Sequence, residues 1–179
     1  MKMTFLRIFQ TEIKRQCKFA IIANNDLFLA LKTGDVDRLW YSVQSFLVAT
    51  GNLSKLLWPS KSSLPNRGVE LRQSLSINDN SPLAPRTFRN HFEHFDERLE
   101  RWIVSSRQHI FVDSNIGPQN MIGGVDKEDY IRNFDTTNSV VTFRGDLYYL
   151  KPVIEAVQEL WEKAVIESQK PKWSLADGY

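Results

Sequence analysis

Four residues near the middle of the chain carry side chains suited to acid–base and phosphate chemistry: Arg89, Asn90, His91 and His94. A histidine with an ordinary pKa of about 6.5 can take a proton from a ribose 2′-hydroxyl or give one to a leaving oxygen at neutral pH. An arginine stays charged and can brace a phosphate, while an asparagine can orient the histidine or bind the phosphate. Neither role requires a metal, and RNA supplies its own nucleophile. The residue types therefore suit a metal-independent site for RNA.

These residues lie in a segment, residues 85–104, whose spacing predicts one amphipathic helix. On such a helix Asn90 and His94 are four residues apart and point the same way, whereas Arg89 lies about 140° from His94. Two copies of the helix that meet across a symmetric dimer can pool the arginine and the histidine more easily than one copy can. We therefore expect a homodimer. The opposite side of the helix is an apolar stripe, predicted to pack into the bundle, formed by Phe88, Phe92, Phe95, Leu99 and Trp102.

The run RNHFEH at residues 89–94 resembles the Arg-x4-6-His motif of the HEPN superfamily, in which a polar residue, often Asn, follows the arginine. In that superfamily the motif lies on a helix of an α-helical bundle, after long antiparallel helices. The resemblance implies a dimeric, metal-independent ribonuclease of the toxin or defence type, without a cofactor. Arg89, Asn90 and His94 match the catalytic positions, and His91 is a secondary candidate. RNA and a protein antitoxin or regulator are the partners that it implies.

Three other interpretations of the chain stay open. The charged residues around His94 can simply cover a solvated helix face, in which case the chain is a non-catalytic interaction or regulatory protein of the same fold. His91 and His94, with Glu97 nearby, are two candidate metal ligands that lack a clear third. Residues 114–138 read as a long loop that could bind a small ligand, because loops of this length are often functional.

The surrounding pattern predicts a mainly α fold, an antiparallel helical bundle with a small antiparallel β element in the C-terminal third. Apolar periodicity predicts one long helix over residues 4–32 and a second over 35–57, with Gly34 ending the first and Asp35 capping the next. A short helical turn follows at residues 69–77. Residues 109–113 and 139–143 are β-branched or aromatic runs expected to pair, and Pro152 favours a last helix over 152–168.

Length and composition bound the remaining possibilities. With 179 residues, 42% hydrophobic and 25% charged, the chain fits a single globular domain: residues 1–105 as bundle core, 106–170 as β element plus final helix, and 171–179 as tail. A net charge of +2 is too small to indicate a nucleic-acid binder by itself. Cys17 is the sole cysteine and is expected in the core, and no apolar run has the length of a membrane span, so we expect a cytoplasmic protein.

Overall fold

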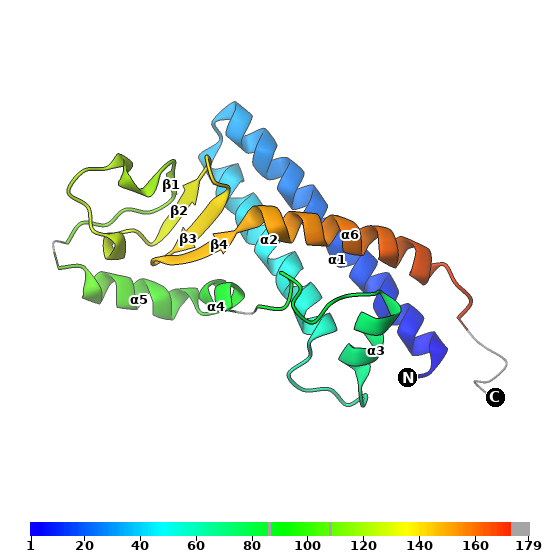
Figure 1. The fold of residues 1–179 in the computed structure, drawn as a ribbon. Helices are drawn as coiled ribbons and strands as arrows, with labels where there is room; N and C mark the ends of the chain where they lie inside the picture. Colours follow the sequence, from blue (N-terminus) through cyan, green and yellow to red (C-terminus); the bar gives the residue numbers. More distant parts are fainter. Residues whose placement is uncertain (86, 108, 173–179) are drawn as a thin grey trace.

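A computed structural model describes residues 1–85, 87–107 and 109–172, without the side chains of residues 87–89 and 119. Its largest unit is the helical hairpin of α1 (Met3–Thr33) and α2 (Val36–Leu57), which run antiparallel (Figure 1). Gly34 ends α1 with φ of 70°, a conformation that glycine adopts without strain. The Asp35 carboxylate accepts a hydrogen bond from the Arg38 N–H and caps α2. The two predicted helices and their tight turn are confirmed.

The last helix, α6 (Leu150–Ser168), lies along α1 and completes the helical body (Figure 1). The short α3 (Arg67–Ser74) packs near the other end of α2. Because α6 covers α1, residues far apart in the sequence share one apolar core, in which Cys17 is fully buried as expected. Core members from the three long helices include Ile13, Cys17, Leu27, Val43, Leu53, Leu57, Val157 and Leu160.

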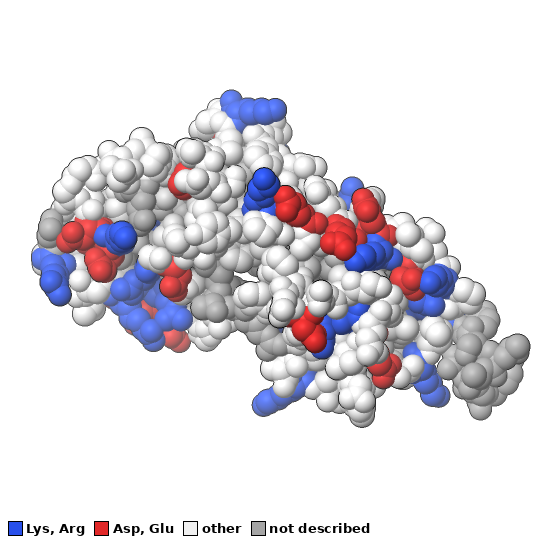
Figure 2. Space-filling model, in the orientation of Figure 1, with Lys and Arg blue, Asp and Glu red and all other residues white. Residues whose placement is uncertain are grey.

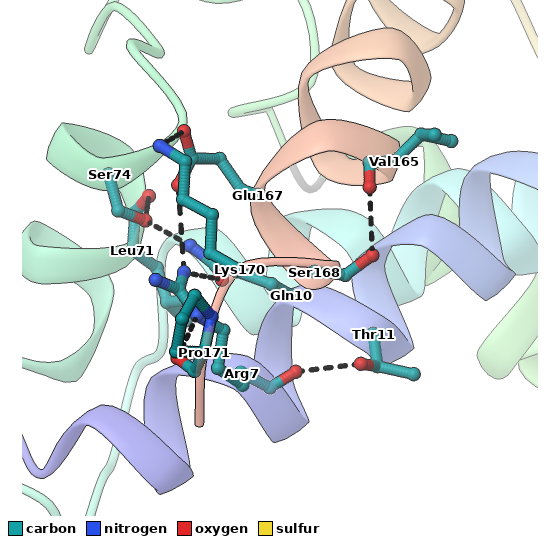
Figure 3. Close-up of polar contacts among 10 residues, drawn as sticks. All are labelled: Arg7, Gln10, Thr11, Leu71, Ser74, Val165, Glu167, Ser168, Lys170 and Pro171. Atoms are coloured by element: carbon teal, nitrogen blue, oxygen red, sulfur yellow. Dashed lines mark hydrogen bonds and ion pairs between the residues drawn. The ribbon is translucent and has the colours of Figure 1, made fainter. Parts of the chain in front are cut away.

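A buried polar network joins α1, α3 and the segment after α6 (Figure 3). The Arg7 guanidinium donates to Gln10 Oε1 at 2.6 Å and to the Pro171 carbonyl at 3.2 Å, and it lies 3.5 Å from Glu167 Oε2. Gln10 in turn donates to Ser74 Oγ at 3.0 Å. The Pro171 carbonyl, at the start of the predicted tail, is thus held against α1, whereas residues 173–179 lie outside the described part.

The helix predicted over residues 85–104 is broken at His94. It divides into α4 (Thr87–Glu93) and α5 (Phe95–Ser105), and His94 between them has φ of −119° and ψ of 43°. The apolar stripe nevertheless holds: Trp102 is buried, and Phe92, Phe95 and Leu99 pack against the core. The Phe88 side chain lies outside the described part.

A four-stranded sheet lies between α4–α5 and the first turn of α6. Its strand order is β1 (Asn115–Ile116), β2 (Arg132–Asp135), β3 (Val140–Phe143) and β4 (Asp146–Tyr149). The pairs β2–β3 and β3–β4 are antiparallel, as expected of the β element, and the added β1 is parallel to β2. The mainly α fold with this element in the C-terminal third is confirmed.

The pairing expected between residues 109–113 and 139–143 is wrong. Residues 139–143 supply β3, but β3 pairs with β2 and β4. From the other run, Val112 forms one isolated parallel bridge with Tyr130. β2 carries the polar residues Arg132, Asn133 and Asp135, which hide it from a search for apolar alternation.

The inner face of the sheet packs on α2 and on the α4–α5 pair. Phe143 meets Phe92 and Phe95 edge to face, with ring centroids 5.4 and 6.1 Å apart. The Arg132 guanidinium lies over the rings of Trp40 and Phe95. The aromatic stripe therefore packs chiefly on β3, whereas the sequence had suggested a helical partner for it.

Candidate functional site

His94 occupies the break between α4 and α5. Its N–H donates to the Asn90 carbonyl and its carbonyl accepts from the Arg98 N–H, both at 3.1 Å, so the main-chain hydrogen bonds persist through the bend. The imidazole is 55% exposed. A bend at this position presents the ring to solvent, and a substrate can reach it without any opening of the fold.

Glu97 lies between His94 and Arg101. Its Oε1 is 3.4 Å from His94 Nδ1, and its Oε2 is 3.5 Å from the Arg101 guanidinium. These distances are too long for strong hydrogen bonds, but a carboxylate on the Nδ1 side favours a proton on that nitrogen. Nε2 is then the basic nitrogen of the neutral ring. The sequence placed Glu97 among the charges of a solvated helix face and near two candidate metal ligands, and it did not predict a role for Glu97 in orienting the imidazole.

The other two matched positions are described less completely. Asn90 lies in α4 and is half-buried, with its carbonyl bound to the His94 N–H. Arg89 belongs to α4 by its backbone, and its side chain lies outside the described part. The structure thus brings Asn90 and His94 together through the main chain, and the convergence of Arg89 with His94 stays a prediction.

His91, the secondary candidate, faces the sheet. The residue is 8% exposed, its ring stacks on Phe143 with centroids 4.9 Å apart, and its Nε2 lies 2.8 Å from Asp146 Oδ2. Burial lowers the pKa of His91, and the nearby Arg98 and Arg144 lower it further, against the opposing effect of Asp146. His91 therefore joins α4 to the β3–β4 hairpin.

This placement separates the two histidines that a shared metal would need. Among the described residues, no group of three or more His, Cys, Asp or Glu side chains is arranged to hold a metal ion. The buried ring of His91 contacts the exposed Asp146 of β4, whereas the exposed ring of His94 contacts Glu97 of α5.

Three arginines gather beside this site: Arg98 and Arg101 of α5, and Arg144 of the turn between β3 and β4. Figure 2 shows Lys and Arg side chains collected over α5. Arg144 donates to Ser105 Oγ at 3.0 Å, and its pKa is lowered by burial and by the charges of Arg101 and Arg98. The Arg98 Nε is buried, and no described residue accepts a hydrogen bond from it. We call these three residues the arginine cluster.

The arginine cluster was not recognised in the sequence. Arg98 and Arg101 are three residues apart on one helix face, which is a weak signal, and Arg144 is distant in the chain. Crowded cations of this kind repel one another, and an anion that binds among them relieves the repulsion. A phosphate ester matches the fork of N–H donors on each guanidinium.

No protein-family model, curated protein or solved structure matches the chain. Among the described residues, no helix combines the length and apolar character needed to cross a lipid bilayer.

Proposed function

We propose that the chain is a HEPN-like, metal-independent endoribonuclease of the toxin or defence type that acts as a homodimer. The observation that supports this most is the exposed imidazole of His94 at a helix break, backed by Glu97 and bordered by the arginine cluster. Phosphodiester cleavage by the neighbouring 2′-hydroxyl needs little more than proton transfer and stabilisation of negative charge.

The roles divide by chemistry. The 2′-oxygen attacks phosphorus and forms a cyclic phosphate, and the P–O5′ bond breaks. A base removes the 2′-hydroxyl proton, and an acid donates a proton to the departing 5′-oxygen. His94 performs one of these transfers, with Glu97 as a positioning residue. Arg89 and Asn90 hold the phosphate, and the arginine cluster binds the flanking strand.

The need for both a base and an acid favours a dimer, because each chain offers one His94 and two copies offer two. The apolar groove between α1 and α2, of about 630 Å³, is the surface we assign to the second copy. It exposes Phe19, Ile22, Tyr41 and Val48. Large exposed apolar patches mark interaction sites.

Charge and position both suit this assignment. A smaller hollow shares Gln44, Val48 and Asn52 with the groove and reaches Phe92 and Glu93 of α4. A second copy of the chain bound in the groove therefore lies next to α4, the helix that carries Arg89 and Asn90. The charges along this face are already paired, Asp26 with Arg38 and Lys55 with Glu93, so two copies of the face do not repel each other.

The test is cleavage of single-stranded RNA by the purified protein in the presence of a chelator. We expect His94→Ala to lower the rate by about 10²–10⁴, the usual contribution of an acid–base residue. His109→Ala, at another exposed histidine, is the matched control and keeps the wild-type rate. Equal cleavage by wild type and His94→Ala contradicts the proposal.

The groove also supports a second candidate, a non-catalytic interaction protein of the same fold. Tyr41 in the groove is 70% exposed, which is typical of a surface that awaits a partner. Val48→Asp, measured by light scattering after gel filtration, separates the two. Loss of a homodimer together with loss of cleavage supports the ribonuclease, whereas loss of assembly in a protein that never cleaves RNA supports the alternative.

A further inference from the structure

The outer face of the sheet holds a narrow trough between β2 and β4. Two rows of paired residues form it: Asn133, Thr142 and Leu147 in one row, and Asp135, Val140 and Tyr149 in the next. Since alternate residues of a strand point to one face, all six lie on the side away from Phe143. Val140 and Thr142 are small and buried, so they form the floor, and the space above them measures about 520 Å³.

One wall of the trough is polar and already organised. Asp135 Oδ1 accepts hydrogen bonds from the Thr137 and Asn138 N–H groups, and its Oδ2 accepts from Asn138 Nδ2 at 2.8 Å. These bonds, led by the one from the Asn138 side chain, lower the pKa of Asp135 and keep it ionised. A carboxylate oxygen with a single bond still has a lone pair for a ligand N–H.

Asn133, in the same wall, carries a donor with no partner among the described residues. The residue is 1% exposed and its Oδ1 accepts from Asn115 Nδ2, yet no described residue accepts from its own Nδ2. A buried polar group left unsatisfied costs free energy. A ligand acceptor that reaches this nitrogen removes that cost.

The facing wall is apolar. Leu147 and Tyr149 line it, and both are more than half exposed. They belong to β4, the edge strand of the sheet (Figure 1). A phenol ring beside a trough offers a flat surface on which another ring can stack. The trough therefore suits a flat ligand with one apolar face and one edge that carries both a hydrogen-bond donor and an acceptor.

We propose that this trough binds one unstacked nucleobase, with a preference for bases that carry an exocyclic amino group. The amino group donates to Asp135, the neighbouring ring nitrogen or carbonyl accepts from Asn133, and Tyr149 stacks on the base. No cation lines the trough, so the phosphate stays outside, toward Arg144, which is two residues from Thr142 along the chain. That the base belongs to an RNA strand rests on the proposed function.

The first experiment is calorimetric titration of the whole protein with cytidine and adenosine, with uridine and ribose as comparison ligands. Cytidine and adenosine should bind about tenfold more tightly than uridine, whose edge lacks the amino donor to the carboxylate. Tyr149→Ala should weaken cytidine binding by about fivefold or more through loss of the stack. Phe5→Ala, at an exposed aromatic residue on α1, is the control and should bind as wild type does.

Three results overturn the nucleobase assignment: no binding of any nucleoside, equal binding of ribose and cytidine, or equal affinity in Tyr149→Ala. A thermal melt of Tyr149→Ala verifies that the variant is folded. Equal affinity for cytidine and uridine, or wild-type affinity in Asp135→Asn, excludes the role given to Asp135.

A second arm identifies the source of the base and keeps the two proposals apart. We expect a cytosine-containing single-stranded oligonucleotide to bind more tightly than free cytidine, and the gain should disappear in Arg144→Gln. Equal affinities mean that the trough serves free nucleosides and overturn the RNA source. If RNA is cleaved but Tyr149→Ala alters neither affinity nor cleavage position, the trough proposal fails alone. If cytidine binds at Tyr149 but no RNA is cleaved, the ribonuclease proposal fails alone.

Discussion

The imidazole of His91 lies almost parallel to the ring of Phe143, with centroids 4.9 Å apart and 15° between the planes. This stack holds His91 against the sheet, next to the exposed Asp146, so that of the two histidines in the motif only His94 is exposed to a substrate. The primary and the secondary candidate of the sequence therefore have different tasks. His91 holds α4 on the sheet, and His94 is available for chemistry.

His91 should make folding stability depend on pH. Its pKa is lowered in the folded state, so the unfolded chain binds more protons once the pH falls below about 6.5. Stability from this residue is complete above that value and is lost as the pH falls through the folded pKa. The groups that face it are Phe143, Asp146, Arg98 and Arg144. We expect the free energy of unfolding in urea, measured between pH 7 and 5, to depend less on pH in His91→Gln than in wild type. An unchanged pH dependence contradicts the assignment.

Phe143 should be among the most sensitive core positions. It is fully buried and touches the rings of His91, Phe92 and Phe95. Phe143→Ala removes these contacts and leaves a cavity, which costs about 3–5 kcal/mol of unfolding free energy. Denaturant unfolding followed by circular dichroism measures the loss. Ile166→Ala, at an exposed position of α6, should change the free energy by less than about 0.5 kcal/mol.

Arg7→Met tests the buried polar network. The substitution keeps much of the apolar stem, leaves Gln10 Oε1 and the Pro171 carbonyl without this donor, and removes the ion pair with Glu167, which keeps its bond from Lys170. Removal of one partner from a buried ionic network costs about 3–5 kcal/mol. Arg15→Met, at an exposed arginine of the same helix, should cost less than about 1 kcal/mol. Similar thermal unfolding of both variants would show that the network contributes little.

The arginine cluster should appear in the salt dependence of RNA binding. Each phosphate contact that is removed lowers the slope of log affinity against log salt by about 0.7 for a single strand. Arg101→Gln should lower the slope by this amount, measured by fluorescence anisotropy with a 2′-deoxy oligonucleotide that cannot be cleaved. Arg15→Gln should leave the slope unchanged. A slope that responds equally to both substitutions would assign the effect to overall charge.

Cys17 should be inert in the folded protein. Burial raises the pKa of its thiol to about 12, and the residue is fully enclosed by the helical core. The reactive species is the thiolate, so a thiol reagent at pH 8 should label the protein only after denaturant is added. Rapid labelling of the native protein would show that α1 opens from the bundle.

The helices were predictable because their signals are local. Apolar periodicity indicates α1 and α2, and Gly34 with Asp35 marks the turn between them. The break at His94 was not predictable, because the apolar stripe keeps its helical spacing on both sides of it. The strand β2 was missed because its polar residues Arg132, Asn133 and Asp135 conceal the apolar alternation that marks a strand. The Arg144 position depends on a turn whose neighbours the sequence does not specify.

Because α6 and the Pro171 carbonyl pack against α1, this part of the core can form only after most of the chain has been synthesised. Contacts such as those from Arg7 to Glu167 and Pro171 join residues separated by 160 positions or more. At a translation rate of roughly 5–20 residues per second, α1 and α2 leave the ribosome on the order of ten seconds before their cover does. The α1–α2 hairpin therefore exposes one apolar side to solvent until α6 has been synthesised and packs against it.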